Sequence, residues 1–326
     1  MNAPVLSPRL IGLDWGTSSL RGYLLGEMGA VQEVRSRPWG ILHTPGGDFS
    51  AAFRDLVGDW RAQWPGIPVL ASGMIGSRQG WREVPYVECP ADPSRIAEGL
   101  LAFETGCGEL HLVPGLVRRG ELPDVMRGEE TQILGAMALE PELAAHALLV
   151  LPGTHSKWAV LREGRIESFS THMTGELFAL LRDHSILGKP AREESPEADR
   201  AAFLRGVRNA LASGAESVSA RLFTARSLFL TGSLRAAHTL EYLSGLLIGE
   251  ELRSVLARFP GGGFPPVVLL GDAALCERYR EAMAEGGIAR TRVLDQTAPA
   301  GLWQIALAAG LLSHDTSPSL VNSAHE

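Results

Sequence analysis

The sequence predicts an α/β protein of two domains built on a duplicated core. A turn of small residues occurs twice, as Gly16-Thr17-Ser18-Ser19 and as Gly153-Thr154-His155-Ser156. Each turn lies between two apolar runs of strand character, and further short strands alternate with helices along both halves of the chain. A chain of 326 residues is long enough for two domains with separate cores.

The first half begins with a strand, the first turn and a second strand over 20–25, and then continues the alternation. The predicted elements that follow are a helix over 49–57, a strand over 68–71, a polar glycine-rich loop over 72–81, and helices over 94–105 and 130–139. Ligands of open α/β sheets bind beyond the carboxyl ends of strands. The loop over 72–81 is therefore a candidate site.

The second half repeats the pattern. Strands over 148–151 and 158–161 flank the second turn, and the later predicted elements are strands over 228–230 and 267–270, helices around 252–259 and 275–283, and a buried last helix over 302–312. We expect residues 1–140 to form an N-terminal domain and 141–299 a C-terminal domain. The C-terminal helix, within 300–313, is expected to pack back on the first domain, and 314–326 to be a disordered tail.

Composition and charge narrow the function class. The net charge of −7 disfavours a nucleic-acid partner, whose phosphates require a basic surface. No apolar run approaches the length of a membrane span, and no signal peptide is evident. Cys89, Cys107 and Cys276 are too few and too far apart for a disulfide framework or a zinc site. We expect a reduced, cytoplasmic protein whose oligomeric state is open, a homodimer being one option.

The two turns have the composition of phosphate-binding loops. Glycine and hydroxyl residues allow backbone N–H groups to converge on an anion without obstruction. Asp14 precedes the first turn and is placed to hold a hydrated magnesium ion, whereas Lys157 follows the second turn. The alternatives are an ordinary hairpin turn for each loop, a turn cap for Asp14 and a surface strand lysine for Lys157.

Longer motifs identify a family. They occupy 71–81, 123–132, 151–158 with 173–178, and 184–188, with a weaker match over 302–305. Together they resemble the 2-dehydro-3-deoxygalactonokinase family, within the superfamily of sugar kinases, hexokinase and actin-like ATPases. The resemblance implies a two-domain actin-like ATPase (ribonuclease H-like) fold with a duplicated mixed-sheet core and an interdomain nucleotide cleft. It also implies phosphorylation of 2-dehydro-3-deoxy-D-galactonate at its C6 hydroxyl, with ATP and Mg²⁺.

The same resemblance suggests roles for the residues inside the motifs. Those expected to bind ATP are Gly16, Thr17, Ser18, Gly153, Thr154, His155, Ser156 and Lys157, with Gly271 and Asp272 at the adenosine. Those expected to bind the sugar acid are Ser77, Arg78, Trp81, Arg127, Thr174 and Glu176. An arginine fork suits the substrate carboxylate, and Arg78 and Arg127 are the candidates, each alternatively a structural surface charge. Trp81 is alternatively a core residue, and Thr174 with Glu176 a helix-capping pair.

A carboxylate must receive the proton of the substrate hydroxyl. Glu129 follows Gly128 as the aspartate follows glycine in related carbohydrate kinases, and it is the favoured base. Asp124 and Glu130 are rivals, each alternatively a helix-start carboxylate. Three other functions are also open: an actin-like or chaperone ATPase, a sugar-acid sensor without kinase activity, and a kinase of another keto-deoxy acid such as 2-dehydro-3-deoxygluconate.

Overall fold

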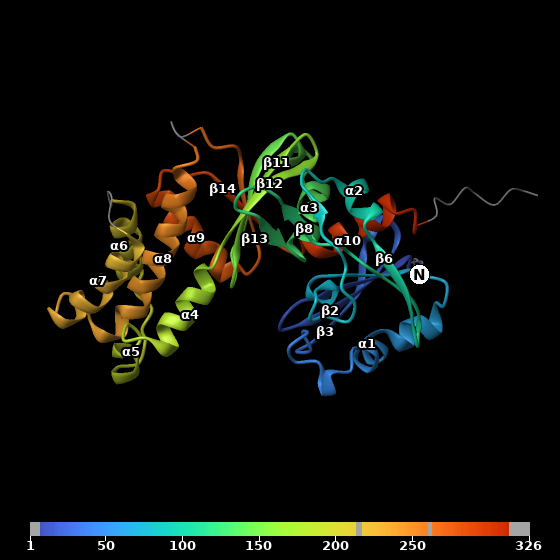
Figure 1. Cartoon of the computed structure of the whole chain (residues 1–326), viewed down its shortest axis with the longest axis horizontal. Coiled ribbons are helices and arrows are strands. Elements are labelled where there is room, and N and C mark those ends of the chain that lie inside the picture. Colours follow the sequence, from blue (N-terminus) through green and yellow to red (C-terminus); the bar gives the residue numbers. More distant parts are fainter. Residues whose placement is uncertain (1–6, 213–216, 260–262, 313–326) are drawn as a thin grey trace, which may run out of the picture. The chain divides into compact units, whose positions relative to one another are not determined.

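The structure is a computed structural model that describes residues 7–212, 217–259 and 263–312 (Figure 1). Contacts divide these residues into two compact units. The first contains 7–85, 93–114 and 302–312, and the second contains 86–92 and the described part of 115–301. The predicted domain boundary near 140 stays a prediction, although contacts group 115–140 with the second unit. The predicted tail over 314–326 lies outside the described residues.

The first unit is built on a six-stranded sheet of order β3-β2-β1-β4-β7-β6. Its strands are β1 (Leu10–Trp15), β2 (Leu20–Leu25), β3 (Val31–Arg37), β4 (Val69–Ser72), β6 (Leu101–Thr105) and β7 (Gly108–Leu112). The first three are antiparallel neighbours, and β4 and β7 continue the sheet parallel to β1. Apolar side chains of these strands form one core, because five residues of α1 (Phe49–Gln63) are buried against them.

The second unit repeats this sheet. Its five strands have the order β12-β11-β10-β13-β14 and comprise β10 (His146–Leu151), β11 (Ser156–Arg162), β12 (Arg165–His172), β13 (Val267–Leu270) and β14 (Thr291–Leu294). Here too three antiparallel strands are followed by two parallel ones. The shared order confirms the predicted actin-like ATPase (ribonuclease H-like) fold with a duplicated mixed-sheet core. A small sheet of β5 (Val87–Glu88), β8 (Leu116–Arg118) and β9 (Asp124–Met126) completes the unit.

Helices pack around both sheets. The remaining α-helices are α2 (Pro93–Glu98), α3 (Glu129–Leu139), α4 (Thr174–His184), α5 (Pro190–Glu193), α6 (Arg200–Leu211), α7 (Val218–Leu230), α8 (Thr239–Leu256), α9 (Ala273–Glu285) and α10 (Thr297–Ala308). The 3₁₀ turns are η1 (Glu27–Gly29), η2 (Pro45–Gly47), η3 (Met74–Gly76), η4 (Pro141–Ala144) and η5 (Ala236–His238). No helix in the described ranges is long and apolar enough to cross a membrane.

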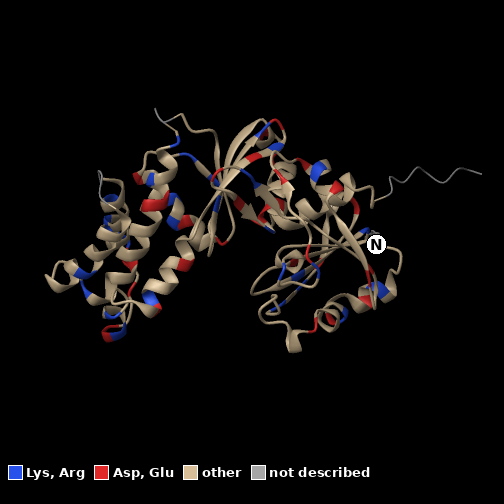
Figure 2. Ribbon diagram, in the orientation of Figure 1, with Lys and Arg blue, Asp and Glu red and all other residues tan. Residues whose placement is uncertain are grey.

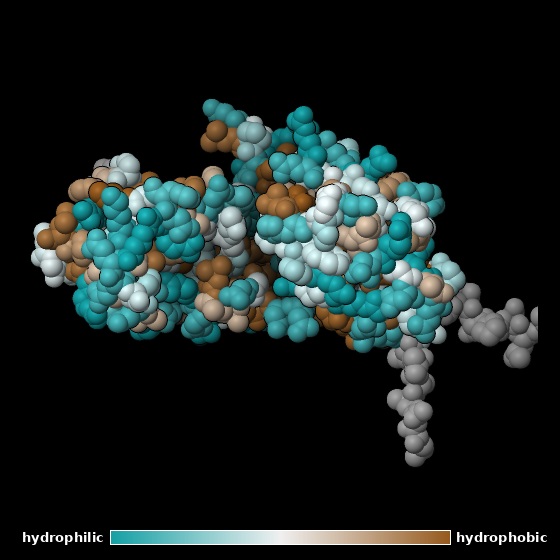
Figure 3. All heavy atoms as spheres, turned by 90° about the horizontal axis from the view of Figure 1, so that it is seen from below, coloured by the Kyte–Doolittle hydropathy of each residue, from teal (hydrophilic) through white to brown (hydrophobic). Residues whose placement is uncertain are grey.

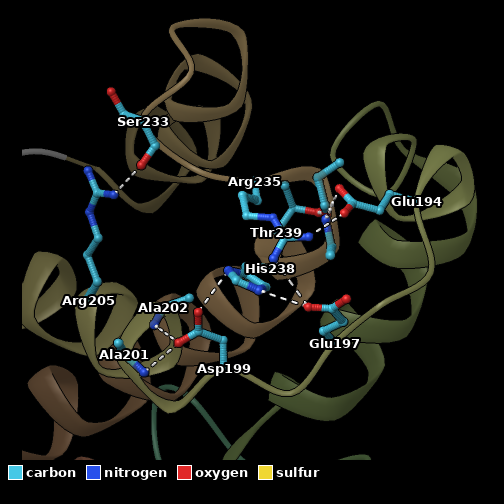
Figure 4. A network of polar contacts seen from close by, with 12 residues as sticks. Glu194, Glu197, Asp199, Ala201, Ala202, Arg205, Ser233, Arg235, His238 and Thr239 are labelled. Carbon is cyan, nitrogen blue, oxygen red and sulfur yellow. Dashed lines mark hydrogen bonds and ion pairs between the residues drawn. The ribbon is translucent and has the colours of Figure 1, made fainter.

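Helix α8 is the central helix of the second unit and packs closely on α6. A Cβ on Gly206 of α6 would lie 2.2 Å from the Tyr242 carbonyl oxygen, and one on Gly245 of α8 only 1.9 Å from that of Phe203. The two backbones therefore touch where both helices carry glycine. Polar contacts fix the start of both helices (Figure 4). Asp199 caps α6, and its carboxylate lies 2.8 Å from the ring nitrogen Nδ1 of His238, the residue that precedes α8.

The surface carries mixed charges and scattered apolar patches. Lysine and arginine are interspersed with aspartate and glutamate along the helices of both units (Figure 2). Brown apolar residues lie among teal hydrophilic ones on the face seen in Figure 3. The exposed large apolar residues of α4 and α7 include Leu177, Leu180, Phe223 and Leu230.

Two predicted elements are wrong. The helix expected over 94–105 is the short α2 followed by strand β6, which pairs with β7 across a tight glycine-containing turn. Alternate residues of β6 are more buried, a period of two that the helix prediction overlooked. The strand expected over 228–230 is the last turn of α7. An apolar run of three residues does not distinguish a strand from a helix end.

Candidate active site

The first turn joins β1 to β2 and is held by backbone contacts. Gly16 donates its N–H to the Ser19 carbonyl at 2.9 Å, while the carbonyls of Gly16 and Thr17 accept from Ile41 and Leu42 at 3.0 and 3.2 Å. Thr17 and Ser18 are exposed. Backbone hydrogen bonds thus hold the turn on one side, while its hydroxyl side chains are exposed on the other, as a phosphate loop requires.

Asp14 lies at the end of β1, opposite Arg21 of β2. Burial raises the pKa of the Asp14 carboxyl, and the nearby Arg21 guanidinium opposes that shift. A buried carboxylate of this kind is stabilised by a further cation close to it.

The candidate substrate loop follows β4. The Ser77 hydroxyl is buried and has no hydrogen-bond partner among the described residues, whereas Arg78 is exposed. The Trp81 ring lies 5.3 Å from that of Phe103 and 5.7 Å from that of Phe53, centroid to centroid. Trp81 therefore belongs to the aromatic core beneath the loop, and Ser77 offers the free polar group.

The second turn joins β10 to β11 and lies against the start of α4. The Thr154 carbonyl accepts a hydrogen bond from the Glu176 N–H at 3.0 Å, and a Cβ on Gly175 would lie 2.4 Å from the Gly153 carbonyl oxygen. The exposed side chains of His155 and Glu176 are in direct contact. The structure thus brings together residues that the sequence assigned to phosphate and to substrate, at a helix N-terminus that favours anions.

A buried network supports this turn from behind. The hydroxyl oxygens of Ser156 and Tyr279 are 2.7 Å apart, and Tyr279 donates to Glu251 at 2.7 Å. Trp158 and Thr174 donate to the same carboxylate. Burial raises the pKa of Glu251, and these donors oppose that shift. The hydroxyl groups of Ser156 and Thr174 are therefore hydrogen-bonded within this buried network.

A cavity of about 530 Å³ opens beside Gly153 and Thr154. Its walls are mainly apolar and include Phe178, Leu247 and Ile248. Its charged residues are Arg182, Glu241 and Arg278, and Arg278 of α9 donates to Glu241 of α8 at 2.9 Å. An apolar cavity of this size with few polar groups is typical of a small-molecule site.

The expected adenosine residues lie near this cavity but do not line it. Gly271 has a φ of +137°, and Asp272 caps α9 by accepting from the Leu275 N–H at 2.9 Å. Of the cavity lining, Gly153, Thr154 and Thr174 were among the predicted site residues. Sequence reasoning missed Glu241 and Arg278, because they meet only through the packing of α8 on α9. A larger hollow, of about 870 Å³, lies at the opposite, amino ends of β13 and β14 and contains no predicted site residue.

Three carboxylates surround the start of α3, and they differ in accessibility. Asp124 is hydrogen-bonded through both oxygens, which accept from the N–H and the hydroxyl of Thr171, both at 2.7 Å, and from the Val125 N–H at 2.8 Å. Glu130 is fully buried and accepts from the Gly128 N–H at 2.6 Å. Burial, and then the neighbouring Glu129, raise the pKa of Glu130 to about 8.

Glu129 keeps 24 % of its side chain exposed. One oxygen accepts from the Arg127 N–H at 3.0 Å, and the other lies 3.8 Å from the Lys157 ammonium. Burial raises the pKa of Glu129, and Lys157 opposes that shift. Arg127 is buried with its guanidinium 4.4 Å above the Tyr86 ring. Of the three carboxylates, Glu129 alone is both ion-paired and partly accessible.

Replacing Glu130 with Gln should change how stability depends on pH. The fold favours the protonated form of Glu130. The contribution of this side chain to folding stability is therefore complete below the ordinary pKa of 4.5 and is lost as pH rises towards about 8. Across that window the unfolding free energy of the native protein should fall relative to the variant by about 1.4 kcal/mol per pH unit. Urea denaturation at several pH values measures the difference, and a constant offset would contradict the expectation.

Comparisons with known proteins identify a family for the chain. A family model described as 2-keto-3-deoxy-galactonokinase matches residues 14–305. A protein of Escherichia coli (strain K12) named 2-dehydro-3-deoxygalactonokinase is 36 % identical, covering 92 % of this chain and 98 % of its own. A protein of Rhizobium meliloti (strain 1021), named a probable 2-dehydro-3-deoxygalactonokinase, is 38 % identical over 89 % of this chain and 94 % of its own. A crystal structure of a candidate 2-dehydro-3-deoxygalactonokinase from Sinorhizobium meliloti superimposes with a TM-score of 0.83 at 37 % identity, covering 92 % of this chain and 98 % of that one.

Proposed function

This chain belongs to the 2-keto-3-deoxy-galactonokinase family, and we propose on that premise that it transfers the γ-phosphoryl group of ATP to the C6 hydroxyl of 2-dehydro-3-deoxy-D-galactonate. It is a carbohydrate kinase, and its product in galactonate catabolism is 2-dehydro-3-deoxy-6-phospho-D-galactonate. The structural observation that carries the proposal is Glu129, a partly accessible carboxylate paired with Lys157.

The nucleotide is assigned to the turns and to the cavity of the second unit. The 530 Å³ cavity adjoins Gly153 and Thr154, so a nucleoside within it would place its phosphates towards the second turn. The start of α4 adds the positive end of a helix there. The hydroxyl side of the first turn, Thr17 and Ser18, is assigned to phosphate as well.

Magnesium is assigned to Asp14. No group of three or more His, Cys, Asp and Glu side chains in the described ranges is arranged to hold a metal ion. Magnesium is commonly held by one or two carboxylates, waters and substrate phosphates, so one carboxylate such as Asp14 is a suitable protein ligand. When bound, the ion would neutralise charge on the phosphates. Asp14 supplies a hard oxygen ligand, and burial makes its ionised form gain from a cation.

Glu129 is assigned the role of general base. Phosphoryl transfer demands positioning and charge neutralisation, together with an acceptor for the hydroxyl proton. Asp124 is held through both oxygens by Thr171, and Glu130 is buried with a pKa of about 8, which leaves it protonated at neutral pH. Glu129 is ion-paired and partly exposed, so its carboxylate is available to take the C6 proton.

The sugar acid is assigned to the loop after β4. Arg78 is exposed beside the unpartnered Ser77 hydroxyl, whereas Arg127 is buried over Tyr86. Arg78 is therefore the better placed arginine for the substrate carboxylate, and Ser77 for a substrate oxygen. Glu176 keeps an accessible carboxylate at the second turn. Because the reaction consumes ATP, we place the protein in the cytoplasm.

Magnesium-dependent ADP release tests the assignment. We expect turnover to require both ATP and 2-dehydro-3-deoxy-D-galactonate, with a lower kcat/KM for the C4 epimer 2-dehydro-3-deoxygluconate. ADP release that ignores every sugar acid would indicate an ATPase of another function. Sugar-acid binding without ADP release would indicate a sensor. A higher kcat/KM for the epimer would make 2-dehydro-3-deoxygluconate the substrate.

A further inference from the structure

Lys157 carries a buried ammonium group beside the Glu129 carboxylate. It lies on β11 with only 6 % of its side chain exposed. A buried charge is unfavourable unless it is paired and hydrogen-bonded. Its Nζ lies 3.8 Å from the Glu129 carboxylate and donates to the Thr171 hydroxyl at 2.9 Å. The side chain therefore points to the start of α3, although the sequence assigned it to ATP.

The hydrogen bonds behind Lys157 have a fixed direction. The Thr171 hydroxyl donates its single proton to Asp124, so its oxygen is left to accept from Lys157. Asp124 is held in turn by the Thr171 N–H on its other oxygen. This series anchors the ammonium on one side and leaves its remaining N–H groups free to face Glu129.

We propose that Lys157 is a positioning residue that keeps the Glu129 carboxylate charged and oriented as the base, with Asp124 and Thr171 as its anchor. The proposal rests on the assignment of Glu129 as the base. It gives Asp124, a rival for that role, another function: Asp124 is bonded to Thr171 through both oxygens and holds Lys157 in place through that residue. The proposed role replaces the ATP-binding role that the sequence suggested for Lys157.

The other charged groups near this pair are few. Besides Lys157, Glu129 faces Glu130 on its own helix and His155 on the second turn, and it accepts from the Arg127 backbone. Lys157 faces Asp124 through Thr171, and Asp124 also faces His172 of β12. Lys157 is the named cation with the greatest effect on the pKa of Glu129, opposing the effect of burial. Removing the Lys157 ammonium group should therefore raise the pKa of Glu129, so that its carboxyl stays protonated up to a higher pH.

The test compares two neutral variants, Lys157→Met and Lys157→Gln, with the charged control Lys157→Arg. An opposite charge at this distance lowers a carboxyl pKa by about 1–3 units. In both neutral variants the acidic limb of the kcat–pH profile should therefore move up by about 1–3 pH units, with kcat recovering at higher pH. Lys157→Arg should stay near the native profile, and KM for ATP should change little. An unmoved limb with a raised KM for ATP would overturn the proposal and make Lys157 a phosphate ligand.

Glu129→Gln, measured in parallel, separates this proposal from the one on which it rests. If Glu129→Gln retains native kcat, the base assignment fails. If that variant is inactive while the neutral Lys157 variants keep the native acidic limb, only the role of Lys157 fails. Infrared titration of the Glu129 carboxylate band, identified by its loss in Glu129→Gln, gives a readout independent of turnover. Thermal unfolding verifies that each variant is folded, and an unshifted band in a folded Lys157→Gln protein would also overturn the proposal.

Discussion

Replacing Glu129 with Gln is expected to lower kcat by about 10²–10⁴-fold while leaving ATP binding nearly intact. The amide keeps the size of the side chain and its acceptor for the Arg127 N–H, but it takes no proton from the substrate hydroxyl. No phosphate contact is removed. Steady-state kinetics give kcat, and titration with a non-hydrolysable ATP analogue gives the nucleotide affinity.

Asp124→Asn is the matched control for this change. It also converts a carboxylate to an amide at the start of α3, but in a side chain whose oxygens are already bonded to Thr171 and Val125. We expect a smaller loss of kcat, arising through the anchoring of Lys157. A fall in kcat of about 10²–10⁴-fold in Asp124→Asn, together with a near-native kcat in Glu129→Gln, would instead identify Asp124 as the base.

Replacing Asp14 with Asn should lower kcat by at least about 10²-fold, because the role of the carboxylate is electrostatic. Folding should survive, since Asn preserves the shape and burial already disfavours the charged form of Asp14. Kinetics across a magnesium titration, together with thermal unfolding, test both parts. A near-normal kcat at saturating magnesium would mean that Asp14 only caps its turn.

The duplicated turn predicted the fold because its signal is local. Each copy lies between strands whose antiparallel pairing follows directly from a short connection, and the later strands add to the same sheets. The errors arose where local pattern is weak. Residues 228–230 are apolar in either a strand or a helix, and only the packing of α7 on α8 decides between them.

The site was less predictable, because its geometry depends on distant contacts. Glycine turns and carboxylates are visible in sequence, yet the choice between Glu129 and Asp124 depends on Thr171, 47 residues after Asp124. Lys157 was assigned by adjacency to a turn, whereas its side chain direction is set by strand register, with Thr171 opposite it. The cavity lining combines α4, α8 and α9, which no single motif encodes.

Helix α10 has a consequence for how the chain is made. It starts in the second unit, but from Leu302 onward it belongs to the first, where Leu302 and Ile305 are fully buried and Leu302 packs on Gly12 of β1. The last strand of the first sheet, β7, ends at Leu112, some 190 residues before Leu302. A ribosome therefore completes the strands of this sheet long before it adds the side chains of α10. The N-terminal unit therefore emerges with part of its core uncovered, and these α10 side chains join it only after the second unit has been synthesised. Synthesis from the N-terminus thus delays completion of the hydrophobic core in the unit whose strands are made first.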